Sequence, residues 1–152
     1  MPDGPTVSNS SCLIALEAAG SLAILEQLYG TIAVPDAVDQ ECGGALPAWV
    51  QVHSVQNQPL ARSLRLDLGA GEAEAIALSI ECSAARLILD DKKARRIARQ
   101  LNLPVTGTLA VLLKAKERGI IPKVRELVDV LRTANFRVSD ALVQEVLRRA
   151  GE

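Results

Sequence analysis

Aromatic side chains are scarce in this 152-residue sequence, where they make up only 2% of the residues. Proteins that bind single-stranded nucleic acid by stacking bases use several aromatic side chains, so a platform of that kind is excluded. Histidine is scarcer still, because His53 is the sole one and lies in a segment without a clear pattern. A histidine general base is therefore not expected, and the sequence shows no pattern of a Ser-His-Asp triad.

The sequence also lacks the cysteine spacing of a metal or disulfide framework. Cys12, Cys42 and Cys82 are odd in number and far apart. This excludes a zinc finger and fits the reducing cytoplasm. No charged-then-apolar leader opens the sequence, and no apolar run reaches the length of a membrane span. We therefore expect a soluble, cytoplasmic protein with no membrane partner.

The composition that is present is that of a globular protein. Hydrophobic residues account for 49% and charged residues for 23% of the sequence, and the length suits one domain over residues 1–152 with an ample core. The net charge of −1 gives the whole molecule no field that attracts nucleic acid. Any such attraction must therefore be local.

Short apolar, β-branched runs alternate with helical segments along the sequence. Strands are expected near residues 6–9, 31–34, 87–89 and 103–106, and the helices between them include residues 72–83 and 92–101. Ser10 or Ser11 can cap the first helix. A strand within residues 49–55 also fits, whereas the rest of 45–68 is expected to be loop. This alternation predicts a three-layer α/β/α sandwich with a parallel sheet, to which residues 122–152 add a C-terminal helical extension.

Acidic and amide residues fall where the strands end, and in open parallel sheets this is where ligands bind. Asn9 follows the first strand, and the pair Asp90 and Asp91 follows the third. Glu41 lies one to two helical turns beyond the second strand, and Glu72 begins a helix after a glycine-rich loop. Clustered carboxylates are costly to ionise together unless a divalent cation lies among them. The pattern predicts a Mg²⁺ or Mn²⁺ site, and from there phosphodiester chemistry.

Other residues near these strand ends have supporting roles in this hypothesis. Glu74 lies about 200° round the helix from Glu72 and should point elsewhere. Hydroxyl groups at strand-to-helix junctions are suited to hold metal-bound waters or to orient carboxylates; these belong to Ser10, Ser11, Thr106 and Thr108.

A basic cluster directly follows the acidic pair, and it is the only strong local positive charge. Phosphate groups held there would lie close to a metal ion. The alternative is an ordinary solvated helix face. The cluster consists of Lys92, Lys93, Arg95, Arg96 and Arg99.

Each acidic position also has an explanation without chemistry. Glu72 is an acid favoured at a helix N-terminus, and Asp90 with Asp91 would serve as a helix cap. Glu41 would be a solvated helix residue, and Asn9 a turn or cap residue. No position is specific alone, and only their joint placement indicates a site.

Taken together, these segments resemble the PIN-domain family, and within it the DUF3368 branch. The likeness extends over nearly the whole sequence in order and spacing. The matching runs are residues 7–16 (VSNSSCLIAL), 32–38 (IAVPDAV) with Glu41, 71–78 (GEAEAIAL), 87–98 (LILDDKKARRIA), 105–109 (VTGTL), 136–140 (FRVSD) and 146–149 (VLRR).

The resemblance implies a magnesium- or manganese-dependent ribonuclease with a parallel sheet in an α/β/α sandwich. A large group of these proteins are toxins that a small antitoxin protein holds, so RNA and such an antitoxin are the implied partners. The family's first acid corresponds to Asn9, the second to Glu41 and the third to Glu72. The fourth corresponds to Asp91, with Asp90 as its neighbour.

Two residues depart from the family pattern. Asn9 offers a metal ion a carbonyl oxygen but no charge, and Lys93 stands where a further acid is often found. Both should weaken metal affinity. Ser11 matches the position whose side chain supports the first acid.

Three hypotheses of function follow. The first is a metal-dependent nuclease acting on RNA. The second is a PIN scaffold that binds nucleic acid or a protein partner without cutting, which Asn9 and Lys93 favour. The third is a small nucleotide- or metabolite-binding protein, against which the incomplete glycine motif of residues 69–72 argues. The low charge and the apolar tail helices also point to a homodimer or a partner protein.

Overall fold

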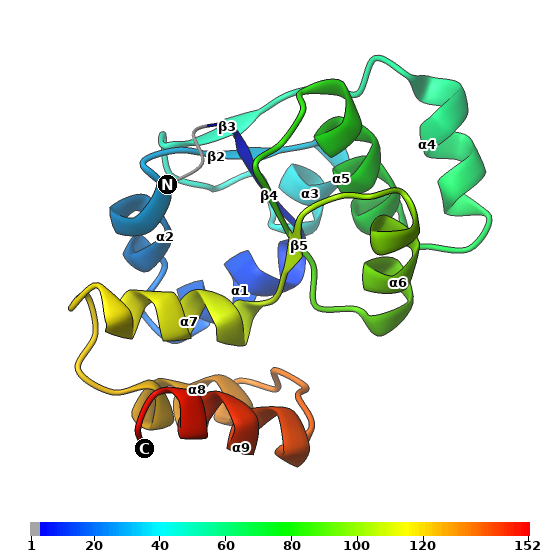
Figure 1. The fold of residues 1–152 in the computed structure, drawn as a ribbon. Coiled ribbons are helices and arrows are strands. Elements are labelled where there is room, and N and C mark those ends of the chain that lie inside the picture. The colour runs from blue at the N-terminus through cyan, green and yellow to red at the C-terminus, as the bar shows by residue number, and fades with distance from the viewer. Residues whose placement is uncertain (1–3) are drawn as a thin grey trace.

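An all-parallel sheet of five short strands runs through the protein (Figure 1). The structure is a computed structural model that describes residues 4–152. Each expected strand position holds a strand, and a fifth strand lies within residues 49–55. The strand order is β3-β2-β1-β4-β5. The strands are β1 (Thr6–Ser8), β2 (Ile32–Val34), β3 (Val50–Val52), β4 (Arg86–Ile88) and β5 (Val105–Thr106).

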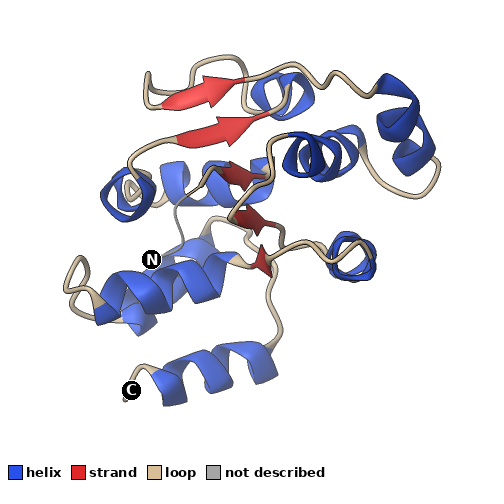
Figure 2. Cartoon of the chain, turned by 45° about the horizontal axis from the view of Figure 1, so that its top comes forward, coloured by secondary structure: helices blue, strands red, loops and turns tan. Residues whose placement is uncertain are grey.

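Helices cover both faces of this sheet, as Figure 2 shows, so the predicted α/β/α sandwich is confirmed. Neighbouring strand residues face opposite layers: Leu87 belongs to one buried cluster and Ile88 to the other. The first layer holds α1 (Ser10–Ala18), α2 (Ala23–Tyr29), α7 (Thr108–Glu117), α8 (Val124–Thr133) and α9 (Asp140–Arg149). The second holds α4 (Gln58–Arg65), α5 (Ala70–Glu81) and α6 (Lys92–Gln100), and the short α3 (Asp36–Glu41) packs against α5.

Helix α4 corrects the prediction that residues 45–68 contain only loop around a strand. Its apolar pattern is short: Leu60, Ala61 and Leu64 pack on the core, and among the residues of the helix only Ala61 is buried. The helix is instead fixed at its N-terminus. Asn57 Oδ1 accepts a hydrogen bond from Leu60 N at 3.2 Å, and the distant Glu81 carboxylate accepts from Gln56 N and Asn57 N.

The order in which strands are added to the sheet reverses at β1, and this determines where the candidate site lies. The chain adds β2 and β3 on one side of β1, then β4 and β5 on the other. Ligand sites of open α/β sheets lie beyond the carboxyl ends of strands at such a switch point. Ser8 is in register with Ile88, and Asn9 N donates to Ile88 O at 3.0 Å. The residues that follow β1 and β4 therefore lie side by side.

The Glu152 carboxylate, at the C-terminus, binds the start of α8 and a lysine of α7. It accepts hydrogen bonds from Val124 N at 2.8 Å and Arg125 N at 3.0 Å, and it pairs with Lys116 Nζ of α7 at 2.9 Å. Burial raises the pKa of Glu152, but these donors outweigh it and bring the pKa down to about 2. The expected helical extension is thus bonded directly to α7. Within residues 4–152, no helix is both long enough and apolar enough to cross a bilayer.

Candidate functional site

Asn9 caps the helix that begins directly after β1. Its Oδ1 accepts a hydrogen bond from Cys12 N at 3.2 Å, and the residue is only 3% exposed. The cap is therefore Asn9 rather than Ser10 or Ser11, because the strand ends one residue earlier than expected and the amide already reaches the first turn. Ser10 and Ser11 are the first two residues of α1.

Asp90 is held at the end of β4 by the first residue of α7. Thr108 donates to it twice, from N to Oδ1 at 2.8 Å and from Oγ1 to Oδ2 at 2.6 Å. Burial raises the pKa of the Asp90 carboxyl, although the two bonds from Thr108 and the charge of Arg95 lower it. Both oxygens of Asp90 are thus already bonded to protein donors. Thr106, which ends β5, lies two residues before Thr108.

The buried thiol of Cys12 interacts with residues at the ends of two neighbouring strands, Ser8 of β1 and Asp90 after β4. Burial, and next the charge of Asp90, raise the pKa of Cys12 to about 12, while hydrogen bonds with Thr108 and Ser8 lower it. Asp90 is therefore close enough to the first turn of α1 for its charge to raise the pKa of Cys12. Cys12 itself remains a protonated thiol, and it is no nucleophile at neutral pH.

Asp91 caps α6 and keeps one oxygen facing outward. Its Oδ2 accepts from Ala94 N at 2.9 Å, and the residue is exposed. No protein donor within residues 4–152 reaches its Oδ1. The cap role and a ligand role therefore use different atoms of the same carboxylate.

Glu41 of α3 contacts residues of two other helices, α1 and α5. It is the last residue of α3, and its Oε1 accepts from Ser10 Oγ of α1 at 2.8 Å. Its carboxyl group also lies against Gly71 of α5, so closely that a Cβ on Gly71 would be 2.9 Å from Glu41 Cδ. Glu41 is exposed. Ser10, and not the exposed Ser11, is thus the hydroxyl bonded to a candidate ligand.

Glu72 and Glu74, two residues apart on α5, have different surroundings. Glu72 is half-buried, and its carboxylate lies over Gly69 at the start of the helix. Glu74 is 7% exposed, accepts from Ala37 N at 3.1 Å and pairs with Arg65. Its charge is thus compensated by the protein, whereas no donor among the described residues binds the carboxylate of Glu72.

The predicted acids differ in whether they have oxygens left for a metal. Glu41, Glu72 and Asp91 each keep at least one carboxylate oxygen without a donor in residues 4–152, and Asp90 keeps none. In that part of the chain, no three or more acidic, histidine or cysteine side chains are gathered as a metal site. Mg²⁺ usually takes one or two carboxylates together with waters and substrate phosphates. The donor chemistry fits such a loosely held ion and not a preassembled cluster.

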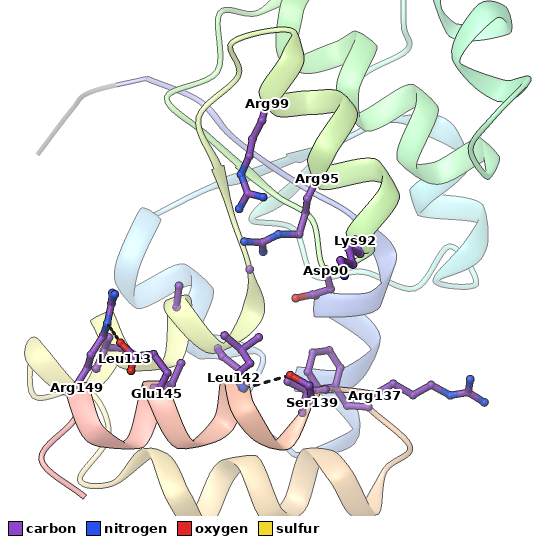
Figure 3. Close-up of a pocket in the computed structure, with 16 residues that line it drawn as sticks. Asp90, Lys92, Arg95, Arg99, Leu113, Arg137, Ser139, Leu142, Glu145 and Arg149 are labelled. Carbon is purple, nitrogen blue, oxygen red and sulfur yellow. Dashed lines mark hydrogen bonds and ion pairs between the residues drawn. The ribbon is translucent and has the colours of Figure 1, made fainter.

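The basic helix α6 divides its charges between two faces. Lys92, Arg95 and Arg99 line a groove toward α7 and α9, as Figure 3 shows. Lys93 and Arg96 do not line it, and Lys93 lies 3.9 Å from Asp67. The Arg95 side chain crosses to the end of β4, where Nη1 donates to Leu89 O at 3.0 Å.

Residues of the tail complete the groove, and sequence reasoning did not assign them. Arg137, Ser139, Leu142, Glu145 and Arg149 form its other wall. Only the excess of arginine near the end of α9 hinted at them, because their position opposite α6 depends on how α9 packs on α7.

With this geometry established, comparison with known protein families is decisive. A model of the DUF3368 family, described as a PIN domain, matches residues 5–152. The chain belongs to the PIN-domain family. No curated protein and no solved structure gave a match. The expected resemblance is thereby confirmed, and it extends through α8 and α9 of this PIN domain.

Proposed function

We propose that this PIN domain is a metal-dependent endoribonuclease that uses Mg²⁺ or Mn²⁺. One observation carries the proposal: Glu41, Glu72 and Asp91 present carboxylate oxygens without protein donors, on elements that meet around the carboxyl edge of the sheet. Asp90 and Glu74, by contrast, are bonded to protein donors. The PIN family, which includes many nucleases, supports the same reaction class.

In this proposal Glu41, Glu72 and Asp91 hold the ion, and Asp90 is a neighbouring carboxylate whose two oxygens are bonded to Thr108. Such an ion supplies an activated water and stabilises charge on the phosphorus and the leaving oxygen. Ser10 orients Glu41 through its hydrogen bond of 2.8 Å. Asn9 contributes a neutral carbonyl oxygen, which already accepts from Cys12 N.

A toxin role, with a small antitoxin as inhibitor, belongs to the same proposal and rests on the family alone. It predicts growth arrest when the wild-type chain is expressed by itself. It also predicts that Asp91→Asn relieves the arrest and that the product of a short adjacent reading frame does so too. Wild-type expression without arrest would contradict it.

A specific observation favours a second candidate, a PIN scaffold that binds nucleic acid or a protein without cutting. Residues 4–152 contain no preassembled group of three or more ligand side chains, and the strand-end position of Asn9 carries no charge. Hard divalent cations gain most from anionic oxygens. Binding of RNA without cleavage at any metal concentration would identify this function.

Two isosteric substitutions test the nuclease proposal, since Asp and Asn are comparably good helix caps. Asn9→Asp adds one negative charge, and Asp91→Asn removes one, while each keeps its cap. We expect Asn9→Asp to tighten Mn²⁺ binding and to raise cleavage of single-stranded RNA. We expect Asp91→Asn to abolish cleavage. Calorimetric metal titration and a gel cleavage assay with and without chelator measure both effects.

The remaining outcomes are equally informative. Efficient wild-type cleavage that Asn9→Asp leaves unchanged would make Asn9 a neutral ligand or a positioning group. If none of the three proteins binds metal or cleaves RNA, the nuclease proposal is wrong and the binding scaffold remains.

A further inference from the structure

A groove of about 560 Å³ lies between the layer of α6 and the C-terminal helix α9 (Figure 3). One wall is the Lys92, Arg95 and Arg99 face of α6, and the other is α9 with residues 136–139. Asp90 and Gly107, which follow β4 and β5, also line the groove, so one part of it lies at the carboxyl edge of the sheet.

Positive charge dominates the lining of this groove. Two carboxylates line it, and both are engaged: Asp90 accepts from Thr108, and Glu145 pairs with two arginines of its own helix, Arg148 and Arg149. Five cations also line the groove, although the whole chain has a net charge of −1. These cations are Lys92, Arg95, Arg99, Arg137 and Arg149.

The α6 cations are poorly compensated within the protein. Lys92 and Arg99 form no ion pair within the described residues. The pKa of Arg95 is lowered, first by burial and next by the charge of Arg99, while Asp90 raises it. Two guanidinium groups that lie close enough to repel would gain from an anion placed between them.

Apolar side chains also line the groove. Leu113 and Phe136 are partly exposed there and Leu142 is 48% exposed, whereas Leu109 is buried. Phe136 is the only phenylalanine of the sequence. A single strand of nucleic acid presents phosphates on its backbone and apolar faces on its bases, and Phe136 offers one ring for a base to pack on, not the platform of several aromatics that the composition excludes.

We propose that this groove holds a short stretch of single-stranded RNA, with phosphates on Lys92 and Arg99 and bases on the apolar side chains. The site rests on the proposed function in one respect, because the strand would continue from the groove to the carboxyl edge where Asp91 lies. The volume is that of small-molecule sites, which span roughly 300–1,000 Å³.

Binding of a labelled single-stranded RNA, followed by fluorescence anisotropy in the presence of chelator, tests the groove apart from cleavage. Lys92→Gln/Arg99→Gln removes two phosphate contacts, each with a salt slope of about 0.7 for single strands. The slope of log affinity against log salt should therefore fall by about 1.4, and the affinity in 0.1 M salt by about 25-fold. The matched control is Arg62→Gln/Lys123→Gln, which removes the same charges from exposed positions outside the groove and should change neither.

Glu145→Gln gives a test that misfolding cannot mimic, since it should strengthen binding. The substitution removes a negative charge from the groove lining and releases Arg149 toward the RNA. Affinity should rise severalfold, whereas Glu117→Gln, outside the groove lining on α7, should leave it unchanged. Equal effects of the groove and control variants would overturn the proposal.

An acidic peptide is the competing occupant, and two probes distinguish it. RNA should lose affinity when the bases are removed, and poly-glutamate of equal charge should compete poorly. Abasic RNA that binds as tightly, with effective competition by poly-glutamate, would overturn the RNA site. Binding as expected without cleavage in Mg²⁺ would refute only the nuclease proposal. Cleavage that the groove variants leave intact, together with intact binding, would refute only the groove.

Discussion

Single residues at the carboxyl edge of the sheet combine a helix cap with an atom left for chemistry. Asp91 caps α6 with Oδ2 and leaves Oδ1 without a protein donor in residues 4–152, so the capping and ligand interpretations of the sequence do not exclude one another. Asn9 differs, because its only carboxamide oxygen is the capping atom. Asn9 therefore brings neither a charge nor a second oxygen to this edge of the sheet.

Gly71 determines where the carboxylate of Glu41 lies. Gly71→Ala would push aside Glu41, whose Cδ would be 2.9 Å from the new Cβ. Because Glu41 is exposed and flexible while alanine favours helix, the free energy of unfolding should change by less than about 1 kcal/mol. Mn²⁺ affinity, measured by calorimetry, should fall.

The control is the same change in a Glu41→Ala background, where it should have no further effect on metal binding. If Gly71→Ala leaves metal affinity at the wild-type level in a stably folded protein, Glu41 is not a ligand.

Thr108 compensates the buried charge of Asp90. Thr108→Val keeps the shape but removes the hydroxyl that donates to Asp90 Oδ2 at 2.6 Å. A hydrogen bond to a charged group is worth about 1.5–3 kcal/mol, and urea unfolding should show a loss of that size. Thr108→Ser keeps the donor and should cost less, even though it loses a buried methyl group. An equal cost for the two variants would mean that this bond does not stabilise the fold.

At the scale of elements, the buried strands were predictable and the exposed helix α4 was not. Residues 31–34 and 87–89 are apolar runs with β-branched members, and such runs are typical of strands buried on both faces. Helix α4 buries only Ala61 and depends on a carboxylate from α5. No local pattern reveals a cap supplied from more than twenty residues away.

The same reasoning explains which parts of the candidate site were foreseen. Strand ends can be located from sequence, so Asn9, Asp90 and Asp91 could be placed at one edge of the sheet. The order of the strands then brings them together. The division of α6 into a groove face and an outer face follows from helical spacing, but which face meets α9 is decided by the packing of α9 on α7. The bond from Ser10 to Glu41 likewise depends on the approach of α1 to α3.

For the whole molecule, Glu152 links the start of α8 to α7 and should make stability depend on acid. Its folded pKa of about 2 lies below the ordinary glutamate value of 4.5. The stabilisation is therefore complete above pH 4.5 and is lost as the pH falls through about 2. Glu152→Gln should cost about 2 kcal/mol near neutral pH, and the difference from wild type should shrink in acid. Urea unfolding across this pH range measures it.

Glu126→Gln, at an exposed position of α8, is the control and should show no such dependence. A cost of Glu152→Gln that stays constant down to pH 2 would mean that packing, and not the charge, holds the tail.

The buried thiol of Cys12 can be used to measure how often α1 separates from the edge of the sheet. Cys12 is fully buried, whereas Cys42 and Cys82 are partly accessible. A chain in which only Cys12 remains would react with a thiol reagent only when α1 separates from the sheet edge. The reaction rate would then report the free energy of that opening. Because Asp90 and Thr108 both interact with this thiol, electrostatically or by hydrogen bonding, a ligand that closes the edge should slow the reaction.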